Sequence, residues 1–548
     1  MGVPGYFARV LRSNPAAVSS EPPARCRYLL VDFNCVVHRQ VRNDSSPDGK
    51  NGDPQTAQDV IDRTMAYLAD KVVGACRLDA DARVLVAADG PPPLAKMMQQ
   101  RGRRFIARYK CPASAGPPPP AHLRGEDPFH RSDITPGTAF AARLDAAVRE
   151  LCRALDRSGR FGGGVVYSGT DEPGEGEHKI MRALRADRRE KREPVIYGLD
   201  ADLLLLSMLH GARTGAWPVV AREADALGAP TNGIADDTLC FVDLRAVCPK
   251  IAGGSTPRLV ANHVVCSFLC GNDFLPPLSC LSVHDGWIET LRGMSGDLEL
   301  ARDVGGSAGS ASAGYERSAS SGPNENNGGG GLAVDASQLA VLLGRLAARE
   351  DADFFRADDR YWKARPRVDS ASEAWNSYPI IHRDETLRSV APGTPGWRRR
   401  FYRRVMGVRH EEDVSRACSE FAAGVAWCAA YYSGGHGALG DEPSWFYPYH
   451  YGPTSVDAAT HASQAFQTDG ALLTCPARRY PRIALTPETV RRFVVPPEAG
   501  ERPLPSDPWA YLYPTGFGLT TYLRHKVWHC GAELPFPTDV ARDVLRVK

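Results

Sequence analysis

Two glutamates, Glu175 and Glu177, stand one residue apart in the stretch PGEGEHKIMRALR, directly before a segment with helical character. They are flanked by glycines and have no apolar neighbour against which to pack. Acidic side chains in the first turn of a helix are stabilised by the positive end of the helix dipole, so helix capping is one interpretation. The other interpretation is that the two carboxylates are ligands for a metal ion.

Five aspartates occupy a second kind of position, the end of a short apolar run. Asp32 closes YLLVD, Asp89 closes VLVAAD, Asp200 and Asp202 close VIYGLDAD, and Asp273 follows SFLCGN. One acid at a strand end is ordinary turn chemistry. In a parallel sheet, however, the carboxyl ends of the strands lie at one edge, and ligands bind there. We therefore expect these aspartates to converge with the two glutamates.

Seven carboxylates at one edge would repel one another strongly unless cations lay among them. Hard oxygen ligands of this kind suit Mg²⁺ or Mn²⁺. Two such ions about 4 Å apart are the usual arrangement for phosphodiester hydrolysis. Asp200 and Asp202, two residues apart in an extended segment, would point the same way. The pattern predicts a catalytic centre for two cations, with separate turn and capping roles as the alternative.

A basic face follows Asp89 in the segment DGPPPLAKMMQQRGRRFIARYK. In a helix, the spacing of four polar side chains places them on one side: Lys96, Gln100, Arg103 and Arg104. A solvated basic face is the ordinary interpretation of such a pattern. Because the face begins just beyond a candidate metal ligand, a phosphate-binding surface is favoured, since guanidinium and amide groups together can enclose a terminal phosphate.

The elements that must position these residues alternate between strands and helices. Short apolar runs such as CRYLLVDFN, ARVLVAADG, GGVVYSGT and REPVIYGLDAD are separated by amphipathic segments such as TAQDVIDRTMAYLADKVVGAC. This alternation predicts an α/β fold with a mostly parallel sheet flanked by helices. We expect a catalytic region over residues 1–300, a flexible Gly/Ser/Asn-rich linker over 301–335, and a mainly helical second region over 336–548 that packs on the first. The Pro-rich segment 111–120 is expected to be a surface loop.

Composition restricts the class of protein. The chain has 548 residues, a net charge of +2, and 14 cysteines without a CxxC pair. A nearly neutral chain must bind a polyanion through local patches. The cysteine pattern predicts free, mostly buried thiols in a reducing compartment. Because no signal peptide and no apolar run of about 20 residues is present, we expect an intracellular, soluble protein with no membrane partner, cytoplasmic or nuclear.

Long motifs in the chain resemble the Xrn-type 5′→3′ exoribonucleases. The first conserved region of that family is similar to MGVPGYFARVL, LLVDFNCVVH, DGPPPLAKMMQQRGRRF, SDITPGTAF, YSGTDEPGEGEHKIM, IYGLDADLLLL and FLCGNDFLPPL, in the same order. Its second region is similar to WRRRFYRRVMG, FAAGVAWCAAYYSGG and SWFYPYHYGPTSVD. The resemblance weakens after about residue 460, where the family's PFxQL-like motif is not recognisable.

The resemblance implies roles for individual residues. The family's catalytic metal ligands correspond to the seven acids already named: Asp32, Asp89, Glu175, Glu177, Asp200, Asp202 and Asp273. Its 5′-phosphate pocket corresponds to the basic face of Lys96, Gln100, Arg103 and Arg104. Aromatic groups that stack on the terminal bases correspond to His38 and Trp445, for which a core histidine and a packed interface tryptophan are the alternatives.

The resemblance also implies an activity. We expect a processive exoribonuclease that requires Mg²⁺ or Mn²⁺, uses two ions and no small-molecule cofactor, and degrades single-stranded RNA from a 5′-monophosphate to nucleoside 5′-monophosphates. Decapping or endonucleolytic cleavage would supply the substrate, and we expect a monomer. The alternatives are a flap-type DNA nuclease of the same superfamily and an inactive RNA-binding scaffold.

Overall fold

A sheet of seven strands organises the first half of the chain. The computed structural model describes residues 2–3, 5–41, 56–109, 129–187, 194–228, 234–304, 331–434, 445–465, 486–496, 510–514 and 516–536. The strands are β1 (Val18–Ser19), β2 (Cys26–Asp32), β3 (Leu78–Ala87), β4 (Val165–Ser168), β5 (Val195–Tyr197), β6 (Val219–Glu223) and β7 (Leu239–Asp243). Their order across the sheet is β1-β7-β6-β5-β2-β3-β4.

The sheet is mostly parallel. Strands β6, β5, β2, β3 and β4 run in the same direction, whereas β7 is antiparallel to β6 and β1 is antiparallel to β7. The predicted α/β fold is therefore confirmed. The two antiparallel strands at one side of the sheet were not anticipated from the sequence, because β1 is only two residues long and gives no periodic signal.

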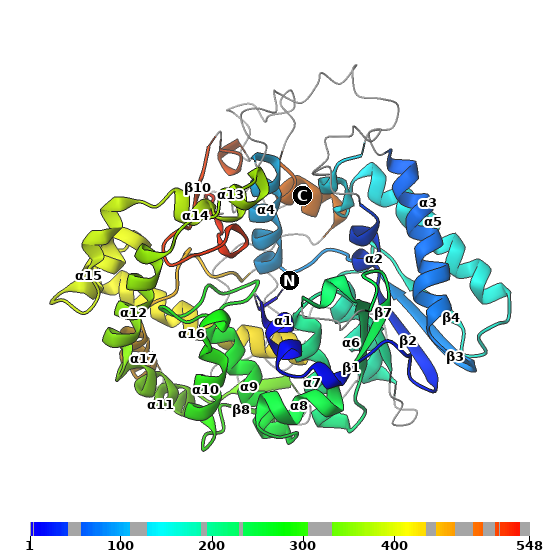
Figure 1. Cartoon of the computed structure of the whole chain (residues 1–548), viewed down its shortest axis with the longest axis horizontal. Helices are drawn as coiled ribbons and strands as arrows, with labels where there is room; N and C mark the ends of the chain where they lie inside the picture. Colours follow the sequence, from blue (N-terminus) through cyan, green and yellow to red (C-terminus); the bar gives the residue numbers. More distant parts are fainter. Residues whose placement is uncertain are drawn as a thin grey trace, which may run out of the picture.

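Helices cover both faces of the sheet (Figure 1). Alternate residues of β2 enter two separate clusters of buried side chains: Tyr28 and Leu30 the larger one, Leu29 and Val31 the other. This is the period of two that a strand buried on both sides requires. Helices α2 (Phe33–Gln40), α3 (Ala57–Tyr67) and α5 (Ala139–Arg157) contribute to the smaller cluster. Helices α6 (Gly176–Ala186), α7 (Asp202–Thr214), α8 (Leu244–Ala252) and α9 (Pro257–Leu269) contribute to the larger one.

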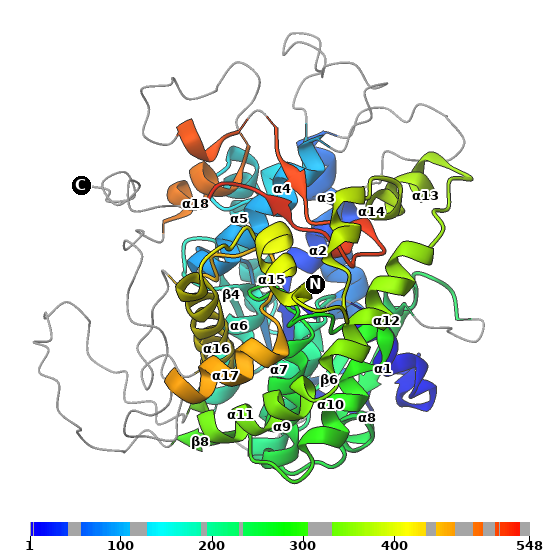
Figure 2. The same cartoon turned by 90° about the vertical axis from the view of Figure 1, so that its left-hand side faces the viewer.

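The larger cluster continues without a break into the second region. In the first region it also includes side chains of α1 (Tyr6–Arg12) and α10 (Trp287–Ser295). In the second region it includes side chains of α11 (Ala336–Ala347), α12 (Glu350–Lys363), α15 (Trp397–Phe401), α16 (Glu411–Ser433) and α18 (Pro487–Val494). Shorter helices α13 (Ala371–Asn376) and α14 (Tyr378–Ile381) complete this part. In Figure 2, α17 (Ser455–Ala465) lies against both α11 and α16. The mainly helical character predicted for this region is confirmed.

Two short strands lie at the ends of the segment predicted as a linker. β8 (Ala301–Val304) pairs antiparallel with β9 (Gly331–Val334). Ordered structure therefore occupies both ends of the 301–335 range, and residues 305–330 between the strands lie outside the described residues. The predicted Pro-rich loop at 111–120 also lies outside them. A second small ladder joins β10 (Gly518–Leu519) to β11 (Ala532–Glu533).

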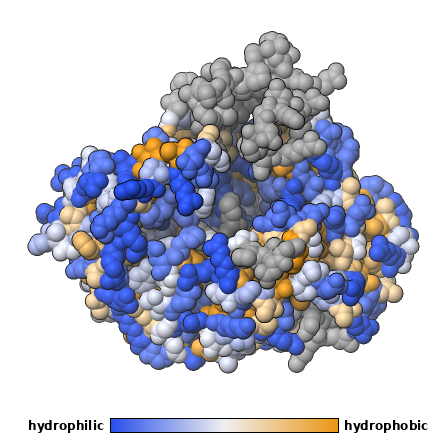
Figure 3. All heavy atoms as spheres, viewed as in Figure 1, coloured by the Kyte–Doolittle hydropathy of each residue, from blue (hydrophilic) through white to orange (hydrophobic). Residues whose placement is uncertain are grey.

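Helix α4 (Leu94–Tyr109) stands between the two regions near the centre of Figure 1. Its buried Arg101 donates to the backbone carbonyls of Pro535 and Leu512, which anchors the helix to the C-terminal segment. The visible face of the molecule is mostly hydrophilic and is hollowed near its centre (Figure 3). This hollow overlies the area in which Figure 1 draws α4.

Two expectations drawn from composition concern thiols and membranes. The cysteines in the described ranges are free, and all except Cys35 and Cys530 are buried, as predicted. Within the same ranges, no helix combines the length and the apolar character needed to cross a bilayer.

The contact between α16 and the first region generates a prediction about Gly424. A Cβ atom at this position would lie 2.7 Å from Leu275 Cδ2 and 2.7 Å from Trp445 Cη2. Because both neighbours are buried, we expect Gly424→Ala to lower the free energy of unfolding by about 1–3 kcal/mol, as overpacking does. Gly344→Ala is the matched control, since nothing lies within 4 Å of its Cβ position in α11. Alanine there should stabilise the helix by up to about 1 kcal/mol. Denaturant unfolding of both variants measures the difference, and equal effects would contradict the close packing of α16.

Candidate metal centre and phosphate-binding surface

Aspartates meet where β2, β3 and β5 end. These strands are neighbours in the order β5-β2-β3 and run parallel, so their carboxyl ends share one edge. Asp32 is the last residue of β2, and Asp89 follows β3 by two residues. Asp202 begins α7, which follows β5, and its backbone N–H lies 3.4 Å from Oδ1 of Asp200. The topology thus brings together acids that lie far apart in the sequence.

The two glutamates lie at the start of α6, close to this edge. The backbone N–H of Gly176 donates to Asp89 Oδ1 at 2.7 Å, which ties the helix start to the end of β3. The Lys179 ammonium donates to the carbonyls of Ala88 and Gly169 and holds the same turn in place. Glu175 precedes the helix but makes no capping hydrogen bond through its side chain. The capping interpretation therefore does not account for this carboxylate.

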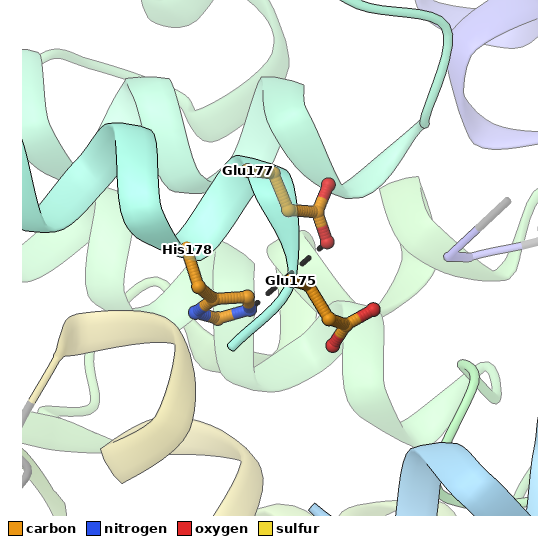
Figure 4. A group of neighbouring side chains, drawn as sticks. All are labelled: Glu175, Glu177 and His178. Atoms are coloured by element: carbon orange, nitrogen blue, oxygen red, sulfur yellow. Dashed lines mark ion pairs between the residues drawn. The ribbon is translucent and has the colours of Figure 1, made fainter. Parts of the chain in front are cut away.

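Glu177 and His178 face the same space as Glu175. One ligand atom from each of these three residues lies within 4.8 Å of the other two, which is compatible with a shared metal ion. His178 Nε2 is 4.0 Å from Glu177 Oε1. Figure 4 shows the two carboxylates and the imidazole gathered at the first turn of α6. Sequence reasoning did not select His178, which lies inside the motif EGEHKIM and offers a nitrogen atom as a candidate ligand.

Lys96 links Glu175 to Asp273. Its ammonium lies 2.5 Å from Glu175 Oε2 and 2.9 Å from Asp273 Oδ2, and all three side chains are buried. Arg103 contacts the other oxygen of Asp273 at 2.9 Å. Burial alone would raise the pKa of Asp273, but the charges of Lys96 and Arg103 outweigh it and hold that pKa far below the usual range. Two residues predicted for phosphate binding are thus ion-paired with a predicted metal ligand.

The rest of the predicted phosphate-binding surface lies beside these ion pairs on α4. Gln100 is half-buried. Arg104 is also half-buried and donates to the carbonyl of Arg131 at 3.3 Å. Burial and then the neighbouring charge of Arg103 lower the pKa of Arg104 to about 10, so it stays cationic at neutral pH. Arg104 thus differs in its surroundings from Lys96 and Arg103, which both contact the Asp273 carboxylate.

Several of the acids are buried beside other carboxylates, which disfavours their ionised form. Burial and then the charge of Asp89 raise the pKa of Asp32 to about 7. Burial and then Asp273 raise the pKa of Asp202 to about 6. Burial and then Glu175 raise the pKa of Glu177 well above its usual value. Asp32 Oδ1 and Glu177 Oε2 are buried and have no hydrogen-bond partner among the described residues. Each of these oxygens lacks the compensation that a buried carboxylate requires.

Several residues outside the predicted set support the acids. Asn34 donates to Asp89 Oδ2 at 2.9 Å, and the Cys35 thiol donates to Asp32 Oδ2 at 2.9 Å. The backbone N–H of Val3 donates to Asp202 Oδ1 at 3.2 Å. At Gly2, a Cβ atom would lie 1.7 Å from the same oxygen, and the φ of +48° also favours glycine. The opening motif MGVPGY belongs to the resemblance described above, but nothing in the sequence indicates its contact with the acids.

Helix α16 of the second region also reaches the acids. The Tyr431 hydroxyl donates to Glu175 Oε1 at 2.7 Å. Burial and then the charge of Glu175 raise the pKa of Tyr431 well above its usual value, so the phenol remains a donor. Tyr432, the next residue, lies close to Asp202. Nothing in the sequence linked these tyrosines to acids more than 200 residues earlier.

The two predicted stacking residues differ in their surroundings. His38 is exposed on α2, yet the surrounding protein and then the charges of Arg104, Arg131 and Arg103 lower its pKa to about 3. The lowered pKa keeps the ring neutral at physiological pH, and the nearby arginines place it beside the basic face. Trp445, by contrast, is only 2% exposed, and its indole lies against Trp427 and Gly424. This burial disagrees with the stacking role predicted for Trp445 and favours its alternative, a packed interface tryptophan.

Comparison with known proteins supports the interpretation of these motifs. Residues 1–214 match the family model described as the XRN 5′-3′ exonuclease N-terminus, and residues 356–468 match the one described as the Xrn1 helical domain. Human 5′-3′ exoribonuclease 1 is 25% identical over 521 residues, which cover 83% of this chain and 29% of the human protein. The 5′-3′ exoribonuclease 2 homolog of Drosophila melanogaster is 23% identical over 93% of this chain and 64% of its own length. The 5′-3′ exoribonuclease 2 of Candida albicans is 27% identical over 53% of this chain and 36% of its own length.

The chain thus spans less than two thirds of the length of each of these relatives. Both family models match, and they do so in the order of the two regions that the sequence and the fold distinguish. The chain therefore belongs to the Xrn-type 5′→3′ exoribonuclease family.

Proposed function

We propose that this protein is a 5′→3′ exoribonuclease that requires a divalent cation and degrades single-stranded RNA from a 5′-monophosphate end. The observation that carries the proposal is the gathering of acids at one sheet edge, beside the cationic face of α4. Its products would be nucleoside 5′-monophosphates, released processively, and its substrate would come from decapping or endonucleolytic cleavage. RNA is the proposed partner, and we propose that the protein acts as a monomer.

The residues at the site fit divalent cations. Buried oxygens of Asp32 and Glu177 lack a partner among the described residues, and hard oxygen ligands are those that Mg²⁺ and Mn²⁺ prefer. The residues proposed to hold two ions are those of the predicted set: Asp32, Asp89, Glu175, Glu177, Asp200, Asp202 and Asp273. Bound there, the ions would lower the pKa of a water molecule and offset the charge that develops on the phosphate. His178 is a further candidate ligand because it lies next to both glutamates.

The chain's cationic residues suit recognition of the 5′-phosphate. Arg104 supplies a guanidinium next to the acid cluster, and Gln100 supplies an amide from the same helix. Lys96 and Arg103 contact ligand carboxylates and would connect the phosphate-binding surface to the cation site. A monophosphate end presents a dianion of small size to these donors, whereas a 5′-hydroxyl end does not. The exposed ring of His38, near the same arginines, is the remaining candidate for stacking on a base.

The two alternatives receive less support. A scaffold that only binds RNA would have no need to bury several carboxylates whose charges repel one another and raise each other's pKa. A flap-type DNA nuclease could use similar acids, but the match of residues 356–468 to the Xrn1 helical domain favours an Xrn-type enzyme.

Cation binding should be visible in the dependence of stability on pH. The folded-state pKa values of Asp32, about 7, and Asp202, about 6, exceed those of ordinary aspartates. Their contribution to stability is therefore fully present below about pH 4 and is lost as the pH rises through 6 and 7. Without divalent cations, we expect the melting temperature to fall between pH 5.5 and 7.5. Mg²⁺ should raise it more at pH 7.5, where the carboxylates are ionised.

Differential scanning fluorimetry with EDTA or Mg²⁺ at both pH values measures this effect. Asp32→Asn should reduce the dependence on pH, because it removes one of the titrating groups. A stabilisation by Mg²⁺ that is equal at both pH values, or absent at both, would contradict a cation site formed by these acids.

Removal of one ligand charge should abolish most turnover. We expect Glu177→Gln to lower the rate of RNA hydrolysis by at least about 10²-fold, the usual loss when a charge-stabilising group is removed from a preorganised site. Glu172→Gln is the control, since this nearby carboxylate is exposed and accepts a hydrogen bond from Ser168 Oγ at 2.6 Å. Single-turnover hydrolysis and RNA binding are measured in parallel. Near wild-type hydrolysis by Glu177→Gln would remove this residue from the metal site.

End selectivity should depend on Arg104. We expect Arg104→Gln to lower the preference for 5′-monophosphate over 5′-hydroxyl RNA by about 10-fold or more, because a hydrogen bond to a charged group contributes about 1.5–3 kcal/mol. Arg157→Gln, on an exposed surface of α5 beside Glu150, is the charge-matched control. The ratio of kcat/KM for the two RNAs is the measurement. An equal loss of kcat/KM on both RNAs would identify Arg104 as part of a general basic surface.

A further inference from the structure

The second region contributes a hydrogen bond to the acid cluster through one tyrosine. Tyr431 lies in the last turn of α16, and its hydroxyl donates to Glu175 Oε1 at 2.7 Å across 256 residues of sequence. The side chain of Tyr431 is buried. Because the other oxygen of Glu175 contacts the Lys96 ammonium at 2.5 Å, each carboxylate oxygen has its own donor. Two donors on two oxygens restrict the rotation of this carboxylate.

Aromatic rings hold Tyr431 from both sides. The His178 ring lies on one face, with centroids 3.9 Å apart and planes inclined by 35°. Trp427, one helical turn earlier, stacks on the tyrosine with centroids 4.9 Å apart and planes inclined by 14°. Trp427 in turn contacts the buried Trp445 at 5.1 Å. Phe274, next to Asp273, meets Tyr431 edge-on at 5.4 Å.

These contacts form a column of rings from the interior of the second region to the acids: Trp445, Trp427, Tyr431 and His178. Offset and tilted ring pairs of this kind stabilise packing beyond the effect of the area that they bury. The column fixes the position of the Tyr431 hydroxyl, since the ring cannot move without losing contacts on both faces. Trp445 thus supports the site by packing against Trp427 and not by direct contact with RNA.

We propose that Tyr431 is a positioning residue, which holds the Glu175 carboxylate in the orientation that divalent cation binding requires. This inference rests on the proposed function, because it assigns Glu175 to the cation site. Hydrogen-bond partners of ligating carboxylates affect metal affinity strongly, and their removal typically costs about 10–100-fold. Through Tyr431, the packing of the second region would set the cation affinity of the first.

The test is cation affinity in the absence of RNA. Isothermal titration calorimetry with Mn²⁺ is performed on the full chain after treatment with EDTA. Tyr431→Phe keeps the ring and its stacking contacts but removes the donor, and we expect its Mn²⁺ affinity to fall by about 10–100-fold. Glu175→Gln, which removes the proposed ligand charge, should weaken Mn²⁺ binding at least as much. Higher Mn²⁺ concentrations should restore RNA cleavage by Tyr431→Phe, because its carboxylates remain intact.

Tyr402→Phe is the matched control, since Tyr402 is also a buried tyrosine of the second region and its hydroxyl bonds to Thr454 instead of an acid. Its Mn²⁺ affinity should remain within about twofold of wild type, a difference below 0.5 kcal/mol. The melting temperature in EDTA reports any general loss of packing in either variant. If Tyr431→Phe affects only packing, the two variants should show the same Mn²⁺ affinity.

An unchanged Mn²⁺ affinity in Tyr431→Phe overturns the positioning role. If Glu175→Gln also binds Mn²⁺ as wild type does, Glu175 is not a ligand and the positioning role is overturned for that reason. The Mn²⁺ affinities test Tyr431 whether or not the wild-type protein cleaves RNA. A wild-type protein that binds Mn²⁺ but degrades no 5′-monophosphate RNA would therefore contradict the proposed function alone.

Discussion

Repulsion among buried carboxylates is the constraint on which the rest of this structure depends. Asp32, Asp202 and Glu177 lie where burial and neighbouring negative charge both favour the protonated form. A protein retains such an arrangement only if something compensates for it. Lys96 and Arg103 compensate for Asp273 and for one oxygen of Glu175. The partnerless oxygens of Asp32 and Glu177 show that, within the described residues, this compensation is incomplete.

Elements from distant parts of the chain hold these charges together. The sheet supplies the aspartates, because neighbouring parallel strands end at one edge. Helix α6 supplies the glutamates, and α4 supplies the cations. Helix α16 supplies Tyr431. Since the larger hydrophobic cluster runs through all of these elements, the acids are fixed by one continuous core and not by a single motif.

The fold was largely predictable because strand periodicity and apolar runs are local properties. The runs that contain β2, β3, β4 and β5 were recognised, and their parallel pairing follows from the intervening helices. The convergence of the strand-end aspartates follows from the same rule. The contacts of Tyr431 and Val3 were not predictable, because they depend on how helices pack across more than a hundred residues. The sequence left stacking and interface packing open for Trp445, because an aromatic residue has the same local signature whether it packs in a core or faces a ligand.

The pairing of β8 with β9 has a consequence for the segment that joins the two regions. Val304 and Gly331 are partners in this ladder, so the two residues that flank segment 305–330 lie next to each other. The separation of the two ends is therefore set by the ladder and does not depend on how many residues lie between them. Closing a longer connection costs only about 0.6 kcal/mol for each doubling of its length. Sequence can accordingly be gained, lost or exchanged between residues 304 and 331 over evolutionary time while the acids and the aromatic column keep their places.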